Sequence, residues 1–180
     1  MSEISNPGER AAREFAVLVP LLTRNGSECV LLTKRPDTLN RYSGQVSLPG
    51  GAREPADRSL WETALREARE EVGIPPEAVE ALTELDWFQT SLGDRIKPYV
   101  GRVSGCEPVV AAPEEVERIL YLPTSRIERD LFHRVSAWSD HDGRRHEVYE
   151  FDLDGHRVWG LTARILYAAF VESEGIRGPG

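Results

Sequence analysis

The chain has 180 residues, which suits one domain with a sizeable core. Its formal net charge of −8 argues against non-specific binding to nucleic acid, because there is no basic excess to neutralise phosphates. No apolar run approaches the length of a membrane span, and the polar first residues lack a signal-peptide core. We therefore expect a cytoplasmic protein that binds neither nucleic acid nor membranes, with Cys29 and Cys106 as free thiols.

The N-terminal third is predicted to begin with a β-hairpin. The apolar run Ala16–Thr23 is typical of a strand, and Pro20 within it predicts an edge position or a bulge. Asn25-Gly26 is a strong signal for a hairpin turn, and Cys29–Thr33 follows as the second strand. A loop-rich segment then leads to a short strand predicted at Gln45–Leu48.

A helix is predicted next, with clear signals at both ends. Ser59 followed three residues later by Glu62 forms a capping-box pattern, and Asp57 is an alternative start. Gly73 can adopt the left-handed conformation that ends a helix, and Pro75 prevents its continuation.

The two faces of this helix carry different residues. Apolar residues at helical spacing predict one buried stripe, formed by Trp61, Leu65, Ala68 and Val72. Glu67, Glu70 and Glu71 are three and four residues apart, so their carboxylates are expected to share a solvated face. Their repulsion becomes useful when a divalent cation lies among them. Gly50-Gly51 before the helix predicts a loop whose backbone approaches another group closely, so the whole segment predicts a metal and phosphate site.

The rest of the chain is predicted as strands, turns and one more helix. Leu82–Thr90 and Ile96–Val103 flank a turn at Gly93-Asp94 and read as antiparallel strands of an α/β sandwich. The remaining predicted elements are strands at 118–122, 132–138, 146–153 and 158–159, a helical turn at 125–131 and a helix at 162–172. One domain is expected over residues 14–174, between a flexible arm at 1–13 and a tail at 175–180.

Residues 50–74 resemble the Nudix box, the signature of hydrolases that cleave a nucleoside diphosphate linked to another group. Residues 66–74 match its pattern of Arg-Glu, an apolar residue, any residue, Glu-Glu, any residue, Gly and an apolar residue. Upstream, Gly51 is followed after five residues by Asp57, where the family has Glu, and then by eight residues before Arg66, where the family has seven. That longer spacing resembles the coenzyme A pyrophosphatase branch of the family.

A second motif of that branch precedes the box. This chain matches it at Leu31-Leu32-Thr33, Arg35, Gly44 and Pro49-Gly50-Gly51. It departs at Pro36 and Leu48, and it has Asn40 where the branch has Arg, with Arg41 one place on. Residues 158–166 resemble the branch's C-terminal segment. The resemblance implies a Nudix-type α/β/α sandwich with a mixed β-sheet, in the α+β class.

The resemblance also implies the chemistry of the site. The metal, Mg²⁺ or Mn²⁺, is expected on Glu67, Glu70 and Glu71 and on the carbonyl oxygen of Gly50. Glu67 is the first choice for the general base, with Glu115 as a second choice or an additional metal ligand. Arg66 is assigned to orienting a glutamate, and Asp57 is expected to cap the helix.

Substrate contacts are implied at five positions, namely Arg35, Gly44, Gln45, Gly51 and Trp159. Trp61 is expected in the core. Trp87, Trp138 and Trp159 are candidates for stacking on adenine, although core packing is the commoner role, and Trp159 is the best candidate of the three. Structural or surface roles are favoured for the histidines, which are His133, His141, His146 and His156.

The expected function is metal-dependent hydrolysis of coenzyme A or acyl-coenzyme A to 3′,5′-ADP and 4′-phosphopantetheine products. One alternative is hydrolysis of another nucleoside diphosphate derivative, such as ADP-ribose, a dinucleotide or a nucleoside triphosphate. Another is a non-catalytic nucleotide sensor, which the intact glutamates oppose. The expected partner is a small nucleotide, and a homodimer is a general expectation for a small enzyme that nothing in the sequence raises or lowers.

Overall fold

The computed structural model describes residues 12–37, 44–105, 114–139 and 143–173. The expected arm at 1–13, apart from residues 12 and 13, and the expected tail at 175–180 lie outside the described residues. The same holds for Asn40, Arg41, Cys106 and His141. Within the described ranges, no helix combines the length and apolarity needed to cross a membrane.

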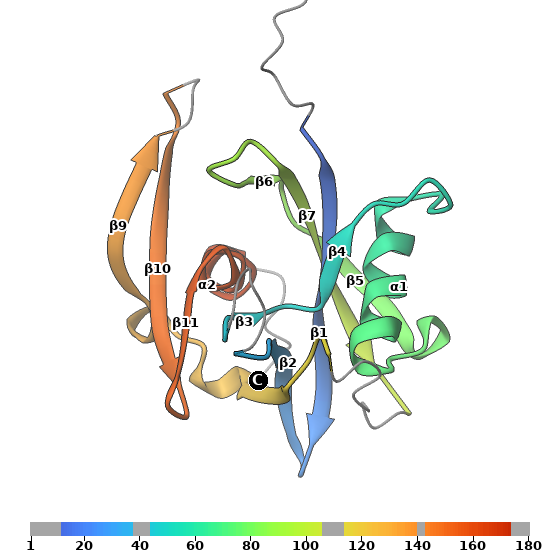
Figure 1. The fold of residues 1–180 in the computed structure, drawn as a ribbon. Helices are drawn as coiled ribbons and strands as arrows, with labels where there is room; N and C mark the ends of the chain where they lie inside the picture. Colours follow the sequence, from blue (N-terminus) through green and yellow to red (C-terminus); the bar gives the residue numbers. More distant parts are fainter. Residues whose placement is uncertain (1–11, 38–43, 106–113, 140–142, 174–180) are drawn as a thin grey trace, which may run out of the picture.

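A large mixed sheet forms the centre of the molecule, with strand order β3-β2-β1-β7-β5 (Figure 1). Its strands are β1 (Glu14–Arg24), β2 (Ser27–Lys34), β3 (Val46–Ser47), β4 (Gly50–Ala52), β5 (Val79–Glu84), β6 (Phe88–Gln89), β7 (Arg95–Val103) and β8 (Arg118–Pro123). The β1–β7 pair is parallel, whereas the other pairs of this sheet are antiparallel. β4, β6 and β8 add to the sheet by pairing with β1, β7 and β2, respectively.

The predicted hairpin at the start of the chain is confirmed. Asn25 and Gly26 have φ values of 50° and 76°, the left-handed backbone that a two-residue hairpin turn requires. The expectation that Pro20 lies at an edge or a bulge is wrong, because β1 is an inner strand of the sheet. Pro20 is tolerated because β1 changes partner around it: Val17 is the last residue paired with β4, and Leu21 is the first paired with β2.

The two faces of β1 bury different layers. Ala16, Leu18 and Leu22 pack with α1 (Leu60–Val72), whereas Val19 and Leu21 pack on the opposite side. That opposite layer contains α2 (Leu161–Tyr167), which a π-helical turn at Ala168–Glu172 continues. The period of two along β1 therefore places one helix on each face of the large sheet.

A three-stranded sheet covers the far side of α2 (Figure 1). It consists of β9 (His133–Ser139), β10 (Arg145–Leu153) and β11 (His156–Gly160), all antiparallel. Short 3₁₀ turns lie at Pro76–Ala78, Thr124–Arg126 and Arg129–Leu131. The α+β class, with a mixed sheet between helices, is confirmed.

Two local predictions need correction. The strand predicted at 82–90 is wrong in its bounds, because β5 begins at Val79 and ends at Glu84, and a register irregularity between Ala81 and Thr83 disturbs its alternation. The buried stripe of α1 is also rotated. Its fully buried apolar residues are Ala64, Ala68 and Val72, whereas Trp61 and Leu65 are half-buried, with Trp61 packed edge-on against the ring of Tyr99.

Candidate active site

The ends of α1 show which residues cap the helix. Ser59 is the N-cap, and its hydroxyl accepts a 3.2 Å hydrogen bond from the backbone N–H of Glu62. Gly73 ends the helix with φ of 68°, as predicted. The expectation that Asp57 caps the helix is wrong, because Ser59 takes that position. Its carboxylate accepts hydrogen bonds from the Glu54 backbone N–H and the Thr63 hydroxyl, both at 2.9 Å.

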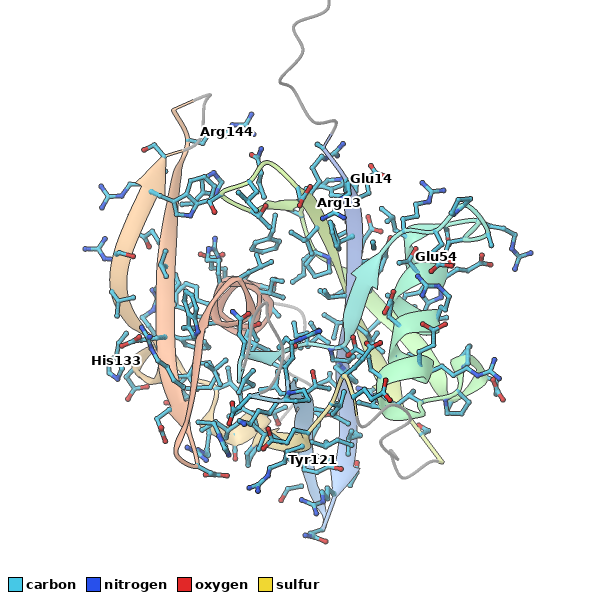
Figure 2. The ribbon with its side chains drawn as sticks, viewed as in Figure 1. Arg13, Glu14, Glu54, Tyr121, His133 and Arg144 are labelled. Atoms are coloured by element: carbon cyan, nitrogen blue, oxygen red, sulfur yellow. The ribbon has the colours of Figure 1, made fainter. Side chains whose placement is uncertain are left out.

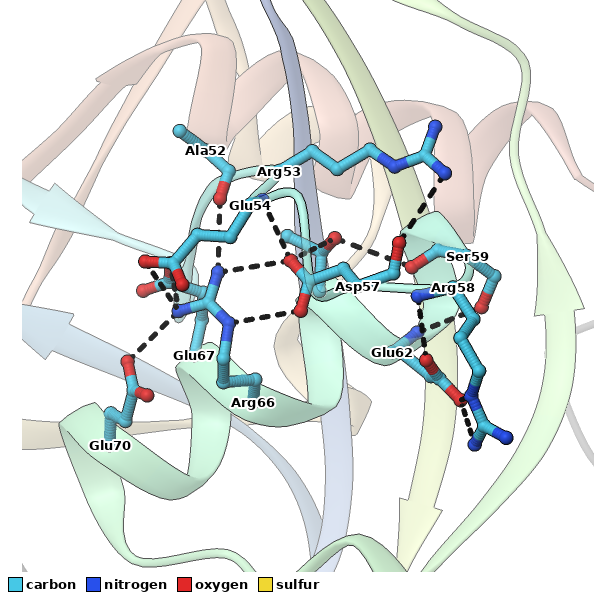
Figure 3. Close-up of polar contacts among 11 residues, drawn as sticks. Ala52, Arg53, Glu54, Asp57, Arg58, Ser59, Glu62, Arg66, Glu67 and Glu70 are labelled. Carbon is cyan, nitrogen blue, oxygen red and sulfur yellow. Dashed lines mark hydrogen bonds and ion pairs between the residues drawn. The ribbon is translucent and has the colours of Figure 1, made fainter.

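Arg66 lies at the centre of a group of carboxylates, which we term the Arg66 cluster: Arg66, Asp57, Glu67 and Glu70 (Figure 3). The guanidinium donates to both carboxylate oxygens of Asp57 at 3.2 Å. It also contacts the carboxylates of Glu67 at 2.9 Å and Glu70 at 3.0 Å. One arginine thus orients two of the predicted ligands, while Asp57 fixes the arginine.

This pairing changes the acidity of Asp57. The Arg66 guanidinium holds the pKa of Asp57 down from an ordinary 3.8 to about 2, although burial acts in the opposite direction. Asp57 therefore stays ionised and keeps Arg66 in place at all physiological pH values.

Glu71 lies in a different environment from the other two glutamates. The expectation that the three carboxylates share a solvated face is wrong, because the Glu71 residue is only 6% exposed. The Glu70 side chain is 58% exposed and that of Glu67 is 15% exposed. The pKa of Glu71 is raised to about 8, mainly because the carboxyl is buried and next because the charge of Glu67 lies nearby. Burial likewise raises the pKa of Glu67, against the effect of Arg66.

The glycine pair is explained by close packing on both sides. A Cβ atom on Gly51 would lie 2.3 Å from Oε1 of Glu67, and one on Gly50 would lie 2.4 Å from the carbonyl oxygen of Ala16. The backbone of Gly50 also hydrogen-bonds the Glu71 carboxylate, which lowers the pKa of that group. The predicted close approach of the loop backbone is therefore an approach to β1 and to the helix glutamates.

The residues fit a divalent cation by their chemistry. Among the described residues, no group of three or more His, Cys, Asp or Glu side chains is arranged so that it could hold a metal ion by itself. Glu71 nevertheless places a carboxylate in a buried position where its charge is unfavourable, next to the charge of Glu67. A hard cation with oxygen ligands relieves that cost, so Glu67, Glu71 and the Gly50 carbonyl are a suitable donor set.

Glu115 acts on the same acids from another part of the chain. It is exposed and lies in the segment that leads into β8. Its charge raises the pKa of both Glu67 and Glu71, so its carboxylate acts electrostatically on both helix glutamates. The fold thus brings together acids that are separated by more than forty positions in the sequence.

A cavity of about 1180 Å³ has Glu71 in its wall. Five of the residues predicted for the site line it, namely Arg35, Gln45, Gly50, Glu71 and Trp159. Of the residues in α1, Glu71 is the one that lines the cavity, whereas Arg66, Glu67 and Glu70 are not part of its lining. Gly44 and Gly51 are also outside the lining, and a Cβ on Gly44 would lie 2.4 Å from a carboxylate oxygen of Asp37.

Arg35 is the most unusual residue of the cavity wall. Its Nε is buried without a hydrogen-bond partner, the one such side-chain nitrogen or oxygen in the described part of the chain. Its positive charge lowers the pKa of Glu71, so the guanidinium acts electrostatically on the acids. A buried N–H without a partner costs free energy, which an anionic ligand in the cavity would recover.

Aromatic residues line the cavity in places that sequence reasoning missed. Core packing is the role that the sequence favours for Trp87 and Trp138, with stacking on adenine as the alternative, and the structure places both in the cavity wall. The Arg95 guanidinium lies 4.0 Å from the centre of the Trp87 ring, and Trp138 stacks on His146 with 4.3 Å between ring centres. No sequence signal separated these rings from core residues, because their positions follow from loop and hairpin geometry.

Basic residues accompany these rings. Arg144, Arg145 and Arg164 line the cavity, and Figure 2 shows Arg144 near the end of the β9–β10 hairpin. The pair Arg144-Arg145 directly after the predicted Asp-Gly turn was the one available sequence signal for a basic wall. The cavity lining therefore combines Glu71 with aromatic and basic residues, and it also contains Asp86, Glu147 and Glu172, the last of which pairs with Arg164 at 2.9 Å. Its arginines and indole rings suit a ligand with phosphates and planar rings.

Comparisons with known proteins agree with this geometry. A family model described as the NUDIX domain matches residues 12–141. A relative from Photorhabdus laumondii, named as an uncharacterized Nudix hydrolase NudL, is 36% identical over 156 residues, covering 86% of this chain and 82% of the relative. A relative of the same name from Yersinia pestis is 37% identical over 155 residues, covering 86% of this chain and 76% of the relative.

Two solved structures share the fold. A MutT/nudix family protein from Enterococcus faecalis has a TM-score of 0.58 at 16% identity, covering 91% of this chain and 62% of that one. The NUDIX domain of Shewanella oneidensis NrtR, solved with ADP ribose, has a TM-score of 0.53 at 19% identity, covering 69% and 81% of the two chains. At these identities the likeness concerns the fold alone.

Proposed function

Because this chain belongs to the Nudix family and is a pyrophosphohydrolase by that membership, we propose that it cleaves the diphosphate of coenzyme A or acyl-coenzyme A. The products would be 3′,5′-ADP and 4′-phosphopantetheine or its acylated form. The observation that carries this proposal is the buried, unpartnered Nε of Arg35 in a cavity that also contains Glu71 and Gly50. Arg35 belongs to the motif that resembles the coenzyme A branch.

The proposed cofactor is Mg²⁺ or Mn²⁺, held by Glu67, Glu70, Glu71 and the Gly50 carbonyl. When bound, such a cation neutralises charge on the diphosphate and favours ionisation of a water molecule. The contacts of the Arg66 cluster support this assignment, since Arg66 orients Glu67 and Glu70. Arg66 is proposed as a positioning residue for these glutamates.

The chain's own residues would carry the remaining chemistry. Glu67 is proposed to accept the proton of the attacking water, supported by its raised pKa, with Glu115 as the second candidate. The water oxygen forms a bond to one phosphorus as the bridging P–O bond breaks, and the departing phosphate leaves with the bridging oxygen. Arg35 is proposed to bind the non-bridging oxygens and to stabilise their developing charge.

The proposed substrate contacts divide between two kinds of group. Arg35 and Gln45, which line the cavity, would bind the diphosphate end together with Gly44 and Gly51, which lie outside its lining, and Trp159 would stack on the adenine. Trp159 is 41% exposed and lines the cavity, which supports this role. We further propose a cytoplasmic location and a homodimer for the active enzyme.

A second candidate is hydrolysis of a different nucleoside diphosphate derivative. The observation that favours it is the presence of three tryptophans, Trp87, Trp138 and Trp159, in one cavity. Coenzyme A carries one planar base, whereas a dinucleotide carries two. A cavity with several indole surfaces therefore also suits the larger aromatic content of a dinucleotide.

A turnover screen separates the candidates. The purified protein is incubated with coenzyme A, acetyl-coenzyme A, ADP-ribose and NADH, each with Mg²⁺ or Mn²⁺, and the products are identified by mass. We expect 3′,5′-ADP from both coenzyme A and acetyl-coenzyme A, and the highest kcat/KM for one of them. If NADH or ADP-ribose is cleaved and coenzyme A is not, coenzyme A is rejected as the substrate, whereas the assignment as a pyrophosphohydrolase stands.

A further inference from the structure

Lys34, the last residue of β2, makes contacts that the proposed reaction has not used. The residue is only 9% exposed. Its Nζ lies 2.9 Å from Oε2 of Glu117 and 3.2 Å from Oδ1 of Asp37, and it donates a hydrogen bond to each. Glu117 follows Glu115, the second candidate for the general base, and Asp37 follows Arg35, which lines the cavity.

The Glu117 contact fixes the segment that carries Glu115. The backbone N–H of Glu117 donates to the carbonyl oxygen of Lys34 at 2.9 Å, so Lys34 holds Glu117 by main chain and side chain together. Val116, between the two glutamates, is 2% exposed. Glu115 is itself exposed, and its position is therefore set by the anchoring of the two residues that follow it.

The Asp37 contact fixes the segment that carries Arg35. The Asp37 carboxylate lies against Gly44, where an added Cβ would be 2.4 Å from Oδ1. The backbone N–H of Arg35 donates to the carbonyl oxygen of Gln45 at 3.0 Å, which closes the same loop. One buried ammonium group thus joins the loop of Arg35 to the segment of Glu115.

We propose that Lys34 is a positioning residue that holds Glu115 in a fixed place relative to Arg35, so that an acid and a phosphate-binding cation act on the same diphosphate. This inference rests on the proposed function, because it needs Glu115 to take part in the reaction. The alternative is an ion pair that contributes only to stability. The positioning role predicts that loss of Lys34 lowers kcat, whereas a purely stabilising ion pair predicts an unchanged kcat.

Single variants test the two arms of the contact. Lys34→Met keeps the length of the side chain and removes its charge, and the freed carboxylates of Glu117 and Asp37 can be solvated because they are 41% and 74% exposed. We expect kcat to fall about 10- to 100-fold, the usual effect of losing a group that orients a reactive residue. Glu117→Gln should reproduce most of that fall, Asp37→Asn should mainly raise KM, and Lys34→Arg should restore at least half of the lost activity.

A double-mutant cycle shows whether Lys34 acts through Glu115. Glu115→Gln is combined with Lys34→Met, and Glu114→Gln, an exposed neighbour, is the matched control. If Lys34 acts through Glu115, Lys34→Met lowers kcat little further in the Glu115→Gln background but fully in the Glu114→Gln background. Equal falls in both backgrounds, or a wild-type kcat for Glu115→Gln, would overturn the proposal.

The cycle uses whichever nucleotide the turnover screen identifies, so a wrong substrate does not affect its outcome. Hydrogen exchange adds a readout that needs no turnover. We expect faster exchange of the Glu117 amide in Lys34→Met, and unchanged exchange in Glu114→Gln. An unchanged Glu117 amide in Lys34→Met contradicts the positioning role even if no substrate is cleaved.

Discussion

The two faces of the large sheet are covered by different types of residue. On one face, α1 packs small apolar residues against β1 and carries its acids in the Arg66 cluster, all within a short stretch of sequence. On the other face, α2 and the β9–β11 sheet surround a cavity lined by aromatic and basic residues from distant segments. Glu71 and Gly50 belong to the first group by sequence and to the cavity by position.

This difference suggests that the α1 face carries out the chemistry and that the cavity face recognises the substrate. A helix can fix several acids relative to one another through its own geometry, which suits chemistry that needs a cation and water. Recognition of a large substrate needs surfaces at several distances from the reacting atoms, which loops and a separate sheet can supply. We therefore expect changes on the α1 face to alter kcat or stability, and changes on the cavity face to alter KM.

The largest effect is expected for Glu71→Gln, at the junction of the two faces. Loss of one charged ligand should remove several kcal/mol of transition-state stabilisation, so kcat should fall about 1000-fold or more. The measurement is kcat with saturating Mg²⁺ or Mn²⁺. Turnover within tenfold of the wild type would reject Glu71 as a ligand.

The stability of the same variant provides its control. The pKa of Glu71 is raised to about 8, so ionising this carboxyl in the folded protein costs free energy above its ordinary pKa of 4.5. Glutamine carries no charge, and we expect metal-free Glu71→Gln to have a Tm at least as high as the wild type at pH 8. A strongly lowered Tm would mean that lost activity reflects unfolding.

Arg35→Lys should have the next largest effect. Lysine keeps the charge but cannot present the N–H fork of a guanidinium, and a hydrogen bond to a charged group contributes about 1.5–3 kcal/mol. We expect kcat/KM to fall about 10- to 100-fold. Arg69→Lys, on the exposed side of α1, is the control and should leave kcat/KM unchanged.

Asp57→Asn tests the α1 face through stability. Arg66 and the other partners lower the folded-state pKa of Asp57 to about 2, from an ordinary 3.8. The ionised carboxyl therefore stabilises the fold by about 2 kcal/mol above pH 4, and this contribution is lost as the pH falls through about 2. Urea unfolding should show a wild-type advantage of that size at pH 7, which shrinks towards zero near pH 2. An advantage that is independent of pH would contradict the assignment.

The smallest effect is expected for tryptophans, which lie on both faces. Trp159→Ala should raise KM about 5- to 10-fold with little change in kcat, since a stacked ring contributes about 1 kcal/mol. Trp61→Phe, on the packed α1 face, should lower Tm and leave KM unchanged. A change of KM in Trp61→Phe and none in Trp159→Ala would contradict the expectation that the cavity face, and not the α1 face, determines KM.

The α1 face could be predicted from the sequence to a large extent. Ser59, Gly73 and the glutamate spacing act over one or two turns of helix, so local pattern determines them. The environment of Glu71 could not be predicted, because its burial depends on β4, whose glycines bring the backbone against β1 and the helix acids. The role of Asp57 was missed for a similar reason, since Arg66 lies nine residues away.

The residues that line the cavity could mostly not be predicted from local sequence patterns. The strands and helix of this half were placed well, because turn residues such as Asp154 and Gly155, with φ of 54° and 83°, mark their ends. Which side chains face the cavity depends on how the small sheet lies over α2. Trp138 and His146 are partners across two strands, and only the tertiary fold places them beside Arg144 in the cavity wall.

The strand β1 has partners at very different distances along the chain. It pairs with β2 across a two-residue turn, with β4 through Val17 and Gly50, and with β7 through Phe15 and Ile96. Local pairings form first because they close short loops, so the parallel pairing with β7 is expected among the late and slow steps of folding. A nascent chain that has not yet been synthesised past β7 therefore has its Nudix box but no finished sheet. Because residues of β11 and α2 line the cavity, we expect activity during synthesis only after these elements have emerged.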